Sequence, residues 1–276
     1  MLLDFQLPLS EQLIFKQGDT MSKIFTPWVA ALLLATGSAA HAGSFVNGGF
    51  EDGSLSGWTG GGGTWSGSPA APVNPSVYAG GTPTNTVTSA GVDPITGAST
   101  TYNGSHAARI NDSINNQSVS TISQSVSNYT DNNIFFAWNA VLESSHGLTD
   151  SDYFSLTLRD DTAGVDLVSR AYSSAGSIGA GTTGVTWSPF GSWFSSGWVV
   201  ENIDVAALGA IGHDFTLTLL ASDCPYGAHA GYVYIDGFGS APPPPGNVPE
   251  PGSLALLGLG LAGLAGVRRR KQAKTA

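Results

Sequence analysis

The chain has 276 residues, and its 20 acidic and 10 basic side chains give a formal net charge of −10. Between residues 43 and 240 there is no lysine, and three arginines stand against sixteen carboxylates, so this region carries −13. A surface of this sign repels nucleic acid and anionic lipid, which excludes nucleic-acid partners and favours solubility or cation binding.

Residues 21–42 have the composition of a secretory signal peptide. Lys23 supplies the positive start, an apolar run extends from Ile24 to Ala35, and Ala40 and Ala42 form an A-x-A cleavage site. We therefore expect export through the Sec translocon, with cleavage after Ala42.

Residues 1–20 do not fit such a signal. They contain three acidic side chains against one lysine, which is the wrong sign for the start of a signal peptide. We expect translation to begin at Met21, and we interpret residues 1–20 as a misassigned extension.

Residues 43–240 are long enough to form one β-sandwich and too short to form two domains of ordinary size. Gly, Ser, Thr and Asn are abundant, no long stretch keeps a helical period, and strand-like runs recur between turn-rich segments. This pattern predicts an all-β sandwich. Residues 60–100, rich in Gly, Pro and Thr, are predicted to be long surface loops, with a disordered tract as the alternative.

The clearest strands alternate between apolar and polar side chains. Apolar residues share one face of 134–142, of 154–158 and of 215–219, and a turn at 160–164 predicts a hairpin. The last strand is predicted at 232–238. The inward residues predicted for the first three strands are Ile134, Phe136, Trp138, Ala140, Leu142, Phe154, Leu156, Leu158, Phe215, Leu217 and Leu219.

Two motifs resemble a known fold. The N-G-G-F-E-x-G-x-L-x-G-W pattern at 47–58 resembles the first strand of galactose-binding-like jelly rolls, which include several carbohydrate-binding modules. The order G-x-x-A-x-R followed by S-Q-S-V, at 104–109 and 123–126, resembles their second and third strands. The resemblance implies a jelly-roll β-sandwich.

The same resemblance implies a structural calcium ion where the first and last strands lie together. Glu51 and Asp236 match the glutamate and aspartate that hold it, and calcium prefers six to eight hard oxygen ligands. The alternative is that both are solvated carboxylates at strand ends.

Carbohydrate binding needs aromatic platforms and polar groups that orient sugar hydroxyls. Trp65, Trp187 and Trp193 are the most loop-like tryptophans, and 187–194 is an aromatic, turn-rich cluster. We predict these three as carbohydrate-binding residues, with simple packing as the alternative for each one.

Residues 221–236 resemble a closing motif of secreted bacterial surface proteins, and they place Asp223, Cys224 and His229 within seven residues. We interpret the segment as a structural loop and the single cysteine, Cys224, as buried rather than as a free thiol or an intermolecular link. A metal-linked role of Asp223 or His229, or catalysis, is the alternative, although the spacing of a zinc site is not met.

An enzyme is the weaker hypothesis, and no catalytic residue is predicted. Asp150 with Asp152, and Asp160 with Asp161, are carboxylate pairs of the kind a glycoside hydrolase needs, but adjacent acids are commonplace in turns. No nucleophile elbow, H-E-x-x-H sequence or phosphate-binding loop is present.

The C-terminal part begins with a proline-rich linker at 241–248 and continues with a signal at 249–276. An uncharged run from Gly252 to Val267 predicts a single transmembrane helix, short at about 24 Å, with a buried core helix as the alternative. The four cations after the helix would stay in the cytoplasm, which puts the body of the protein on the other side of the membrane. The predicted sorting motif is Pro249, Glu250 and Pro251, and the predicted anchor is Arg268, Arg269, Arg270 and Lys271.

These three features in this order resemble the sorting signal of PEP-CTERM proteins, which Gram-negative bacteria export. The resemblance covers the last tenth of the chain and implies processing by exosortase in a biofilm- or floc-forming bacterium. We expect transient anchoring in the inner membrane, followed by the cell surface or extracellular matrix. The expected function is non-catalytic binding or organisation of exopolysaccharide, and a secreted glycan-active hydrolase or a purely structural matrix protein is the alternative.

Overall fold

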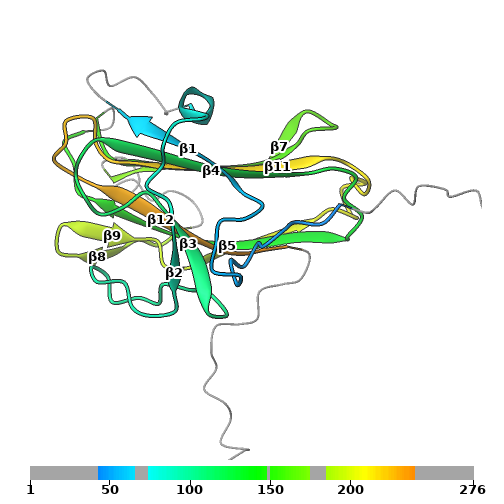
Figure 1. Ribbon diagram of the computed structural model, residues 1–276, viewed down its shortest axis with the longest axis horizontal. Helices are drawn as coiled ribbons and strands as arrows, with labels where there is room; N and C mark the ends of the chain where they lie inside the picture. Colours follow the sequence, from blue (N-terminus) through cyan, green and yellow to red (C-terminus); the bar gives the residue numbers. More distant parts are fainter. Residues whose placement is uncertain (1–42, 66–73, 148–149, 175–184, 240–276) are drawn as a thin grey trace, which may run out of the picture. The chain divides into compact units, whose positions relative to one another are not determined.

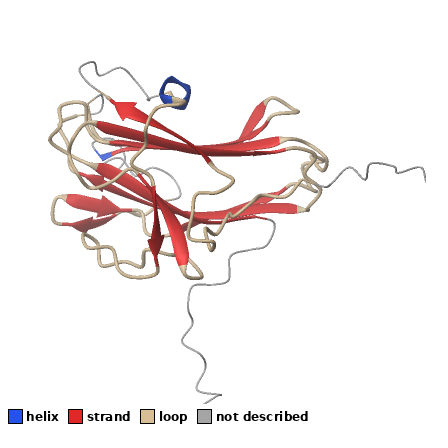
Figure 2. Ribbon diagram, viewed as in Figure 1, coloured by secondary structure: helices blue, strands red, loops and turns tan. Residues whose placement is uncertain are grey.

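The computed structural model describes residues 43–65, 74–147, 150–174 and 185–239, which form two stacked β-sheets (Figures 1 and 2). All named strand pairs are antiparallel. The fold is therefore the predicted all-β jelly-roll sandwich. The predicted signal peptide, linker and sorting signal lie outside the described residues. Within the described ranges, no helix is both long and apolar enough to span a bilayer.

One layer is a five-stranded sheet in the order β1-β4-β11-β6-β7. Its central strands come from distant parts of the sequence, because β11 pairs with both β4 and β6. The strands are β1 (Thr59–Thr64), β4 (Ser118–Val126), β6 (Tyr153–Asp160), β7 (Val165–Ser173) and β11 (Phe215–Ser222).

The other layer is a seven-stranded sheet in the order β2-β3-β12-β5-β9-β8. β10 pairs with the first part of β5, and β9 pairs with its end. The strands are β2 (Thr86–Ser89), β3 (His106–Ile110), β5 (Asn133–Glu143), β8 (Ser188–Phe190), β9 (Trp193–Ser195), β10 (Val199–Asp204) and β12 (Gly231–Gly239).

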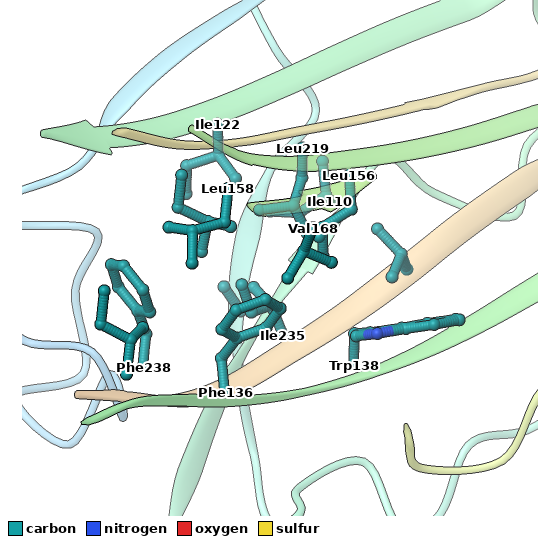
Figure 3. Close-up of a cluster of buried hydrophobic side chains, with 14 of the residues drawn as sticks. Ile110, Ile122, Phe136, Trp138, Leu156, Leu158, Val168, Leu219, Ile235 and Phe238 are labelled. Carbon is teal, nitrogen blue, oxygen red and sulfur yellow. The ribbon is translucent and has the colours of Figure 1, made fainter. Parts of the chain in front are cut away.

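The core lies between the two sheets, where the alternating apolar side chains of both layers meet (Figure 3). All eleven residues predicted to point inward from β5, β6 and β11 are fully buried in this cluster. In Figure 3, Leu156, Leu158 and Leu219 project from one sheet toward Phe136 and Trp138 on the other. The predicted hairpin between β6 and β7 is also confirmed.

An ion pair joins the two layers at one side of the sandwich. Arg170 of β7 donates from Nε and Nη2 to the two carboxylate oxygens of Glu201 on β10, at 2.8 Å each. The indole Nε1 of Trp138 also donates to Glu201, at 3.2 Å. The Glu201 side chain is only 9% exposed, so these donors compensate for the removal of its charge from water.

The resemblance was wrong about the first strand. Residues 47–58 form turns, with Asn47 and Phe50 at positive φ values of 49° and 58°. The pattern instead places Phe50 and Trp58 in the core, with their rings stacked 5.2 Å apart. Trp58 donates from Nε1 to the carbonyl of Asn47 at 3.2 Å, which fixes the turn.

Residues 60–100 are also more ordered than predicted where the structure describes them. They include most of β1, the 3-10 helix η1 (Pro75–Tyr78) and β2. β1 has the sequence T-G-G-G-G-T, so it offers no side-chain alternation from which a strand can be predicted. Glycine is needed here because a Cβ on Gly62 would lie 2.5 Å from the carbonyl oxygen of Thr82.

Trp138→Ala should lower the free energy of unfolding by about 3–5 kcal/mol, because it leaves a cavity beside Phe154 and Tyr172. Urea denaturation of the purified protein measures this loss. Val200→Ala is the matched control, because Val200 is 42% exposed and should cost about 0.5 kcal/mol or less. Equal losses in the two variants would contradict this account of the core.

Candidate functional site

The outward face of the five-stranded sheet carries a row of hydroxyl groups that crosses every strand. Antiparallel pairing sets Thr59 opposite Ser123, Ser123 opposite Thr218, Thr218 opposite Thr157, and Thr157 opposite Ser169. Neighbouring strands lie about 4.8 Å apart, so the row spans about 19 Å. The inward neighbours of these residues fill the core, which leaves the hydroxyl row on the opposite face.

This row lies in an open groove of about 630 Å³. We call it the hydroxyl groove. One edge is formed by η1 and the residues around it, and Tyr153 is the one aromatic residue in the part of the lining that the structure describes. The lining residues are Thr59, Gly60, Asn74, Pro75, Ser76, Ala79, Thr121, Ser123, Tyr153, Ser155, Thr157, Ser169, Arg170, Ala171 and Thr218.

The hydroxyl groove has little charge available for a ligand. Among the described lining residues, Arg170 has the single charged side chain, and its guanidinium is held by Glu201. Burial raises the pKa of Tyr153, so the phenol stays protonated and can donate a hydrogen bond. The groove therefore presents neutral donors and acceptors together with one aromatic face.

The outward face of the seven-stranded sheet is aromatic but covered. Tyr232 and Tyr234 are each 1% exposed, and both hydroxyls donate to Asp93 Oδ2, at 2.7 and 2.8 Å. Trp198 donates from Nε1 to the carbonyl of Ser99 at 3.1 Å. The loop that contains Asp93 and Ser99 thus occupies the aromatic surface that a sugar would need.

The three predicted tryptophans do not form one platform among the described contacts. Trp65 is half-buried at the end of β1, where its backbone N–H donates to Gln117. Trp187 packs edge-on against Tyr172, with ring centroids 5.5 Å apart, beside the main core. Trp193 packs against Tyr232 at 6.0 Å, in the covered aromatic cluster. Their role in carbohydrate binding stays a prediction.

Glu51 and Asp236 converge on residues 102–106, which are the loop before β3 and the first residue of that strand. Asp236 Oδ2 accepts hydrogen bonds from the backbone N–H groups of Tyr102 and Asn103, each at 2.9 Å. Glu51 accepts from the N–H groups of Ser105 at 2.9 Å and of His106 at 3.1 Å. Burial, with a contribution from the charge of Glu51, raises the pKa of Asp236 to about 6.

The space between the two carboxylates is small and lies beside Gly49. A Cβ on Gly49 would lie 3.6 Å from Glu51 Cγ and 3.8 Å from Asp236 Oδ1. Among the described residues, the ion pair of Glu51 is with His106, at 3.9 Å, and Asp236 has none. This hard-oxygen set, negative and short of cations, fits a calcium ion.

Asp223 has a structural role in the closing segment 221–236. Its Oδ1 accepts from Asn111 Nδ2 at 2.9 Å, and its Oδ2 accepts from the N–H groups of Asn116 and Ser118, each at 3.0 Å. Burial raises its pKa to about 6 despite these donors. Cys224 is fully buried, as predicted, and His229 is half-buried in the same loop.

In each predicted carboxylate pair, one acid is buried and held by its own structural partners. Asp152 is fully buried and accepts from the N–H of Glu143 at 2.9 Å and from the hydroxyl of Ser174. Asp160 Oδ2 lies 2.8 Å from His213 Nδ1, whereas Asp161 is exposed.

Comparison with known proteins supports the C-terminal prediction. Residues 247–271 match the PEP-CTERM protein-sorting motif, which indicates an exported, surface-directed protein. The matched stretch contains the predicted motif and the predicted cationic anchor, and it lies outside the described residues. No curated protein matches this sequence.

Several solved carbohydrate-binding modules are similar to this structure. TmCBM61 in complex with β-1,4-galactotriose is 14% identical, with a TM-score of 0.37, over 71% of this chain and 96% of that chain. A CBM28 module specific for non-crystalline cellulose is 15% identical, with a TM-score of 0.36, over 71% and 94%. CBM27-1 of Caldicellulosiruptor saccharolyticus, with mannohexaose, is 9% identical, with a TM-score of 0.35, over 69% and 93%. The glycans named here are those of the compared modules.

Asp93→Ala should lower the free energy of unfolding by about 2–4 kcal/mol, because it leaves the hydroxyls of Tyr232 and Tyr234 buried without an acceptor. Thermal and urea unfolding measure the loss. The same substitution in a Tyr232→Phe, Tyr234→Phe background should cost clearly less. An equal cost in both backgrounds would show that Asp93 does not act through the two tyrosines.

Proposed function

We propose that this chain is an exported, non-catalytic protein that binds neutral polysaccharide in the hydroxyl groove. The observation that carries the proposal is the row of five hydroxyls, one from each strand of the five-stranded sheet. Hydroxyl groups can donate and accept at once, so they match the hydroxyls of a sugar chain without a charged partner. Tyr153 supplies an apolar ring face for sugar CH groups.

The charge of the domain favours a neutral ligand. The −13 balance between residues 43 and 240 repels anionic polymers, and the guanidinium in the groove is already paired. A neutral polysaccharide avoids this repulsion. We infer that the glycan of the proposed function is uncharged.

The sorting motif sets where this binding would act. We propose that exosortase processes the C-terminal signal after transient anchoring in the inner membrane, and that the domain then reaches the cell surface or the extracellular matrix. Binding there would organise exopolysaccharide in a biofilm or floc. Turnover of a neutral glycan by the purified protein would favour the hydrolase alternative.

Calcium forms a second part of the proposal. Glu51 and Asp236 would hold the ion with backbone oxygens, and bound calcium would supply the positive charge that links the turn at 49–51, the loop at 102–106 and β12. Its role is structural. The cation would also offset the mutual repulsion of the two carboxylates.

Thr157→Val combined with Thr218→Val should weaken binding of a neutral polysaccharide about tenfold, because two hydroxyls are lost from the groove at constant shape. Affinity electrophoresis in gels of soluble glucan, mannan and galactan measures the change, with an anionic alginate gel as the comparator. Thr216→Val is the matched control, because Thr216 lies on the same face of β11 outside the groove lining.

Unchanged binding in the double variant would refute the groove. If Trp193→Ala loses binding while the double variant keeps it, the site lies instead at the predicted tryptophan cluster at 187–194.

Calcium should raise the thermal unfolding midpoint of the protein near neutral pH, and Glu51→Gln should remove most of that shift. The unfolded pKa of Asp236 is about 3.9. Its folded pKa of about 6 is higher, so without calcium the stability that this group contributes to the folded protein is lost as pH rises through about 6. Calcium binds the ionised form, so its effect should shrink as pH falls from about 7 to about 5.

Scanning calorimetry with calcium or with a chelator tests this dependence. Asp131→Asn is the control for a lost surface carboxylate, because Asp131 is exposed. No calcium-dependent shift at any of these pH values would end the calcium proposal and leave the groove untouched.

A further inference from the structure

Three soft or borderline metal donors meet at one end of the sandwich. His146 comes from the loop after β5, and Cys224 and His229 come from the loop between β11 and β12. One donor atom from each residue lies within 4.8 Å of the other two. The rings of His146 and His229 are 4.6 Å apart between centroids and inclined at 75°. Histidine rings at this distance can direct nitrogens to one point.

The loop that carries Cys224 and His229 is fixed before any ligand arrives. The N–H of Cys224 donates to the carbonyl of His229 at 2.9 Å, and the N–H of Gly227 donates to the carbonyl of Cys224 at 3.2 Å. Gly227 has a φ of +69°, which permits the tight turn. The N–H of Ala228 donates to Cys224 Sγ at 3.3 Å, and a donor of this kind stabilises negative charge on a metal-bound sulfur.

The two loops are also held against each other. The N–H of Glu143 donates to the carbonyl of Ala230 at 3.1 Å, and the N–H of Ala230 donates to Glu143 Oε2 at 3.1 Å. These bonds tie the end of β5 to the residue that follows His229. The approach of His146 to Cys224 and His229 is therefore set by the pairing of β5 with β12.

We propose that Cys224, His229 and His146 bind one divalent transition-metal ion of the zinc class. One thiolate and two imidazoles are a ligand set that suits zinc and excludes calcium and magnesium, which prefer oxygen. Zinc bond lengths place tetrahedral ligand atoms about 3.3–3.6 Å apart, so the cluster needs to contract by about 1 Å. His146 is exposed, and its ring can move by that amount.

Asp150 is placed to support this site. It follows His146 by four residues, and its charge, with that of Glu143, acts on His229. Its Oδ1 is buried and has no hydrogen-bond partner among the described residues. A carboxylate there can orient a ligating imidazole as a hydrogen-bond acceptor.

The sequence segment alone did not meet zinc spacing, because the third donor is 78 positions upstream of Cys224. Bound metal would cross-link the two loops. This site shares no residue with the lining of the hydroxyl groove, so it can exist whether or not the groove binds glycan.

The test uses the purified, reduced full chain, stripped with a chelator and titrated with Co²⁺ and then Zn²⁺. We expect one Co²⁺ per chain and a thiolate-to-cobalt charge-transfer band that Zn²⁺ displaces. Cys224→Ser should abolish the band, and His146→Gln or His229→Gln should weaken binding about tenfold or more.

His106→Gln is the matched control, because His106 lies on β3 outside the cluster and should leave the titration unchanged. His146→Gln guards against misfolding, because an exposed side chain can be replaced without disturbing the core. Zinc should raise the unfolding midpoint of the parent protein and not that of His146→Gln. A charge-transfer band that survives Cys224→Ser, or zinc affinity that depends on His106 and not on His146, would overturn the site.

Discussion

The contact between the inward faces of the two sheets is the constraint on which the rest of the structure depends. The central strands alternate, so burying Leu156, Leu158 and Leu219 against Phe136 and Trp138 directs every second side chain outward. On the five-stranded sheet those outward residues include Ser123, Thr157 and Thr218, whose hydroxyls align because the strands are in register. The candidate glycan surface is thus a direct result of core packing.

Alternation made the central strands predictable from sequence, because burial on one face imposes a period of two. The glycine strand β1 could not be predicted this way, since its backbone is used for close approach rather than side-chain packing. The hydroxyl groove combines five strands that are distant in sequence, and the histidine cluster joins two loops. Both depend on pairing, which local patterns do not contain.

The two candidate cation sites have different kinds of ligand atoms. Near Glu51 and Asp236, hard oxygens surround a small space in a domain with many carboxylates and few cations. At the β11–β12 loop, sulfur and nitrogen donors come together instead. In both places a cation would tie a loop to β12 or to the residues just before it. The histidine cluster lies near the end of β11 at which Ser222 pairs with Tyr153.

The scarcity of basic residues between residues 43 and 240 affects how an exported protein meets secreted proteases and amine-reactive compounds. Between residues 43 and 240 the chain offers no lysine amine, and its three arginines, Arg109, Arg159 and Arg170, all lie within strands β3, β6 and β7. A secreted protease that cuts after basic residues needs an extended, accessible segment, and paired strands do not supply one. Amine-directed cross-linking likewise finds no lysine side chain between residues 43 and 240, so this part of the chain is protected from reagents that need a lysine amine.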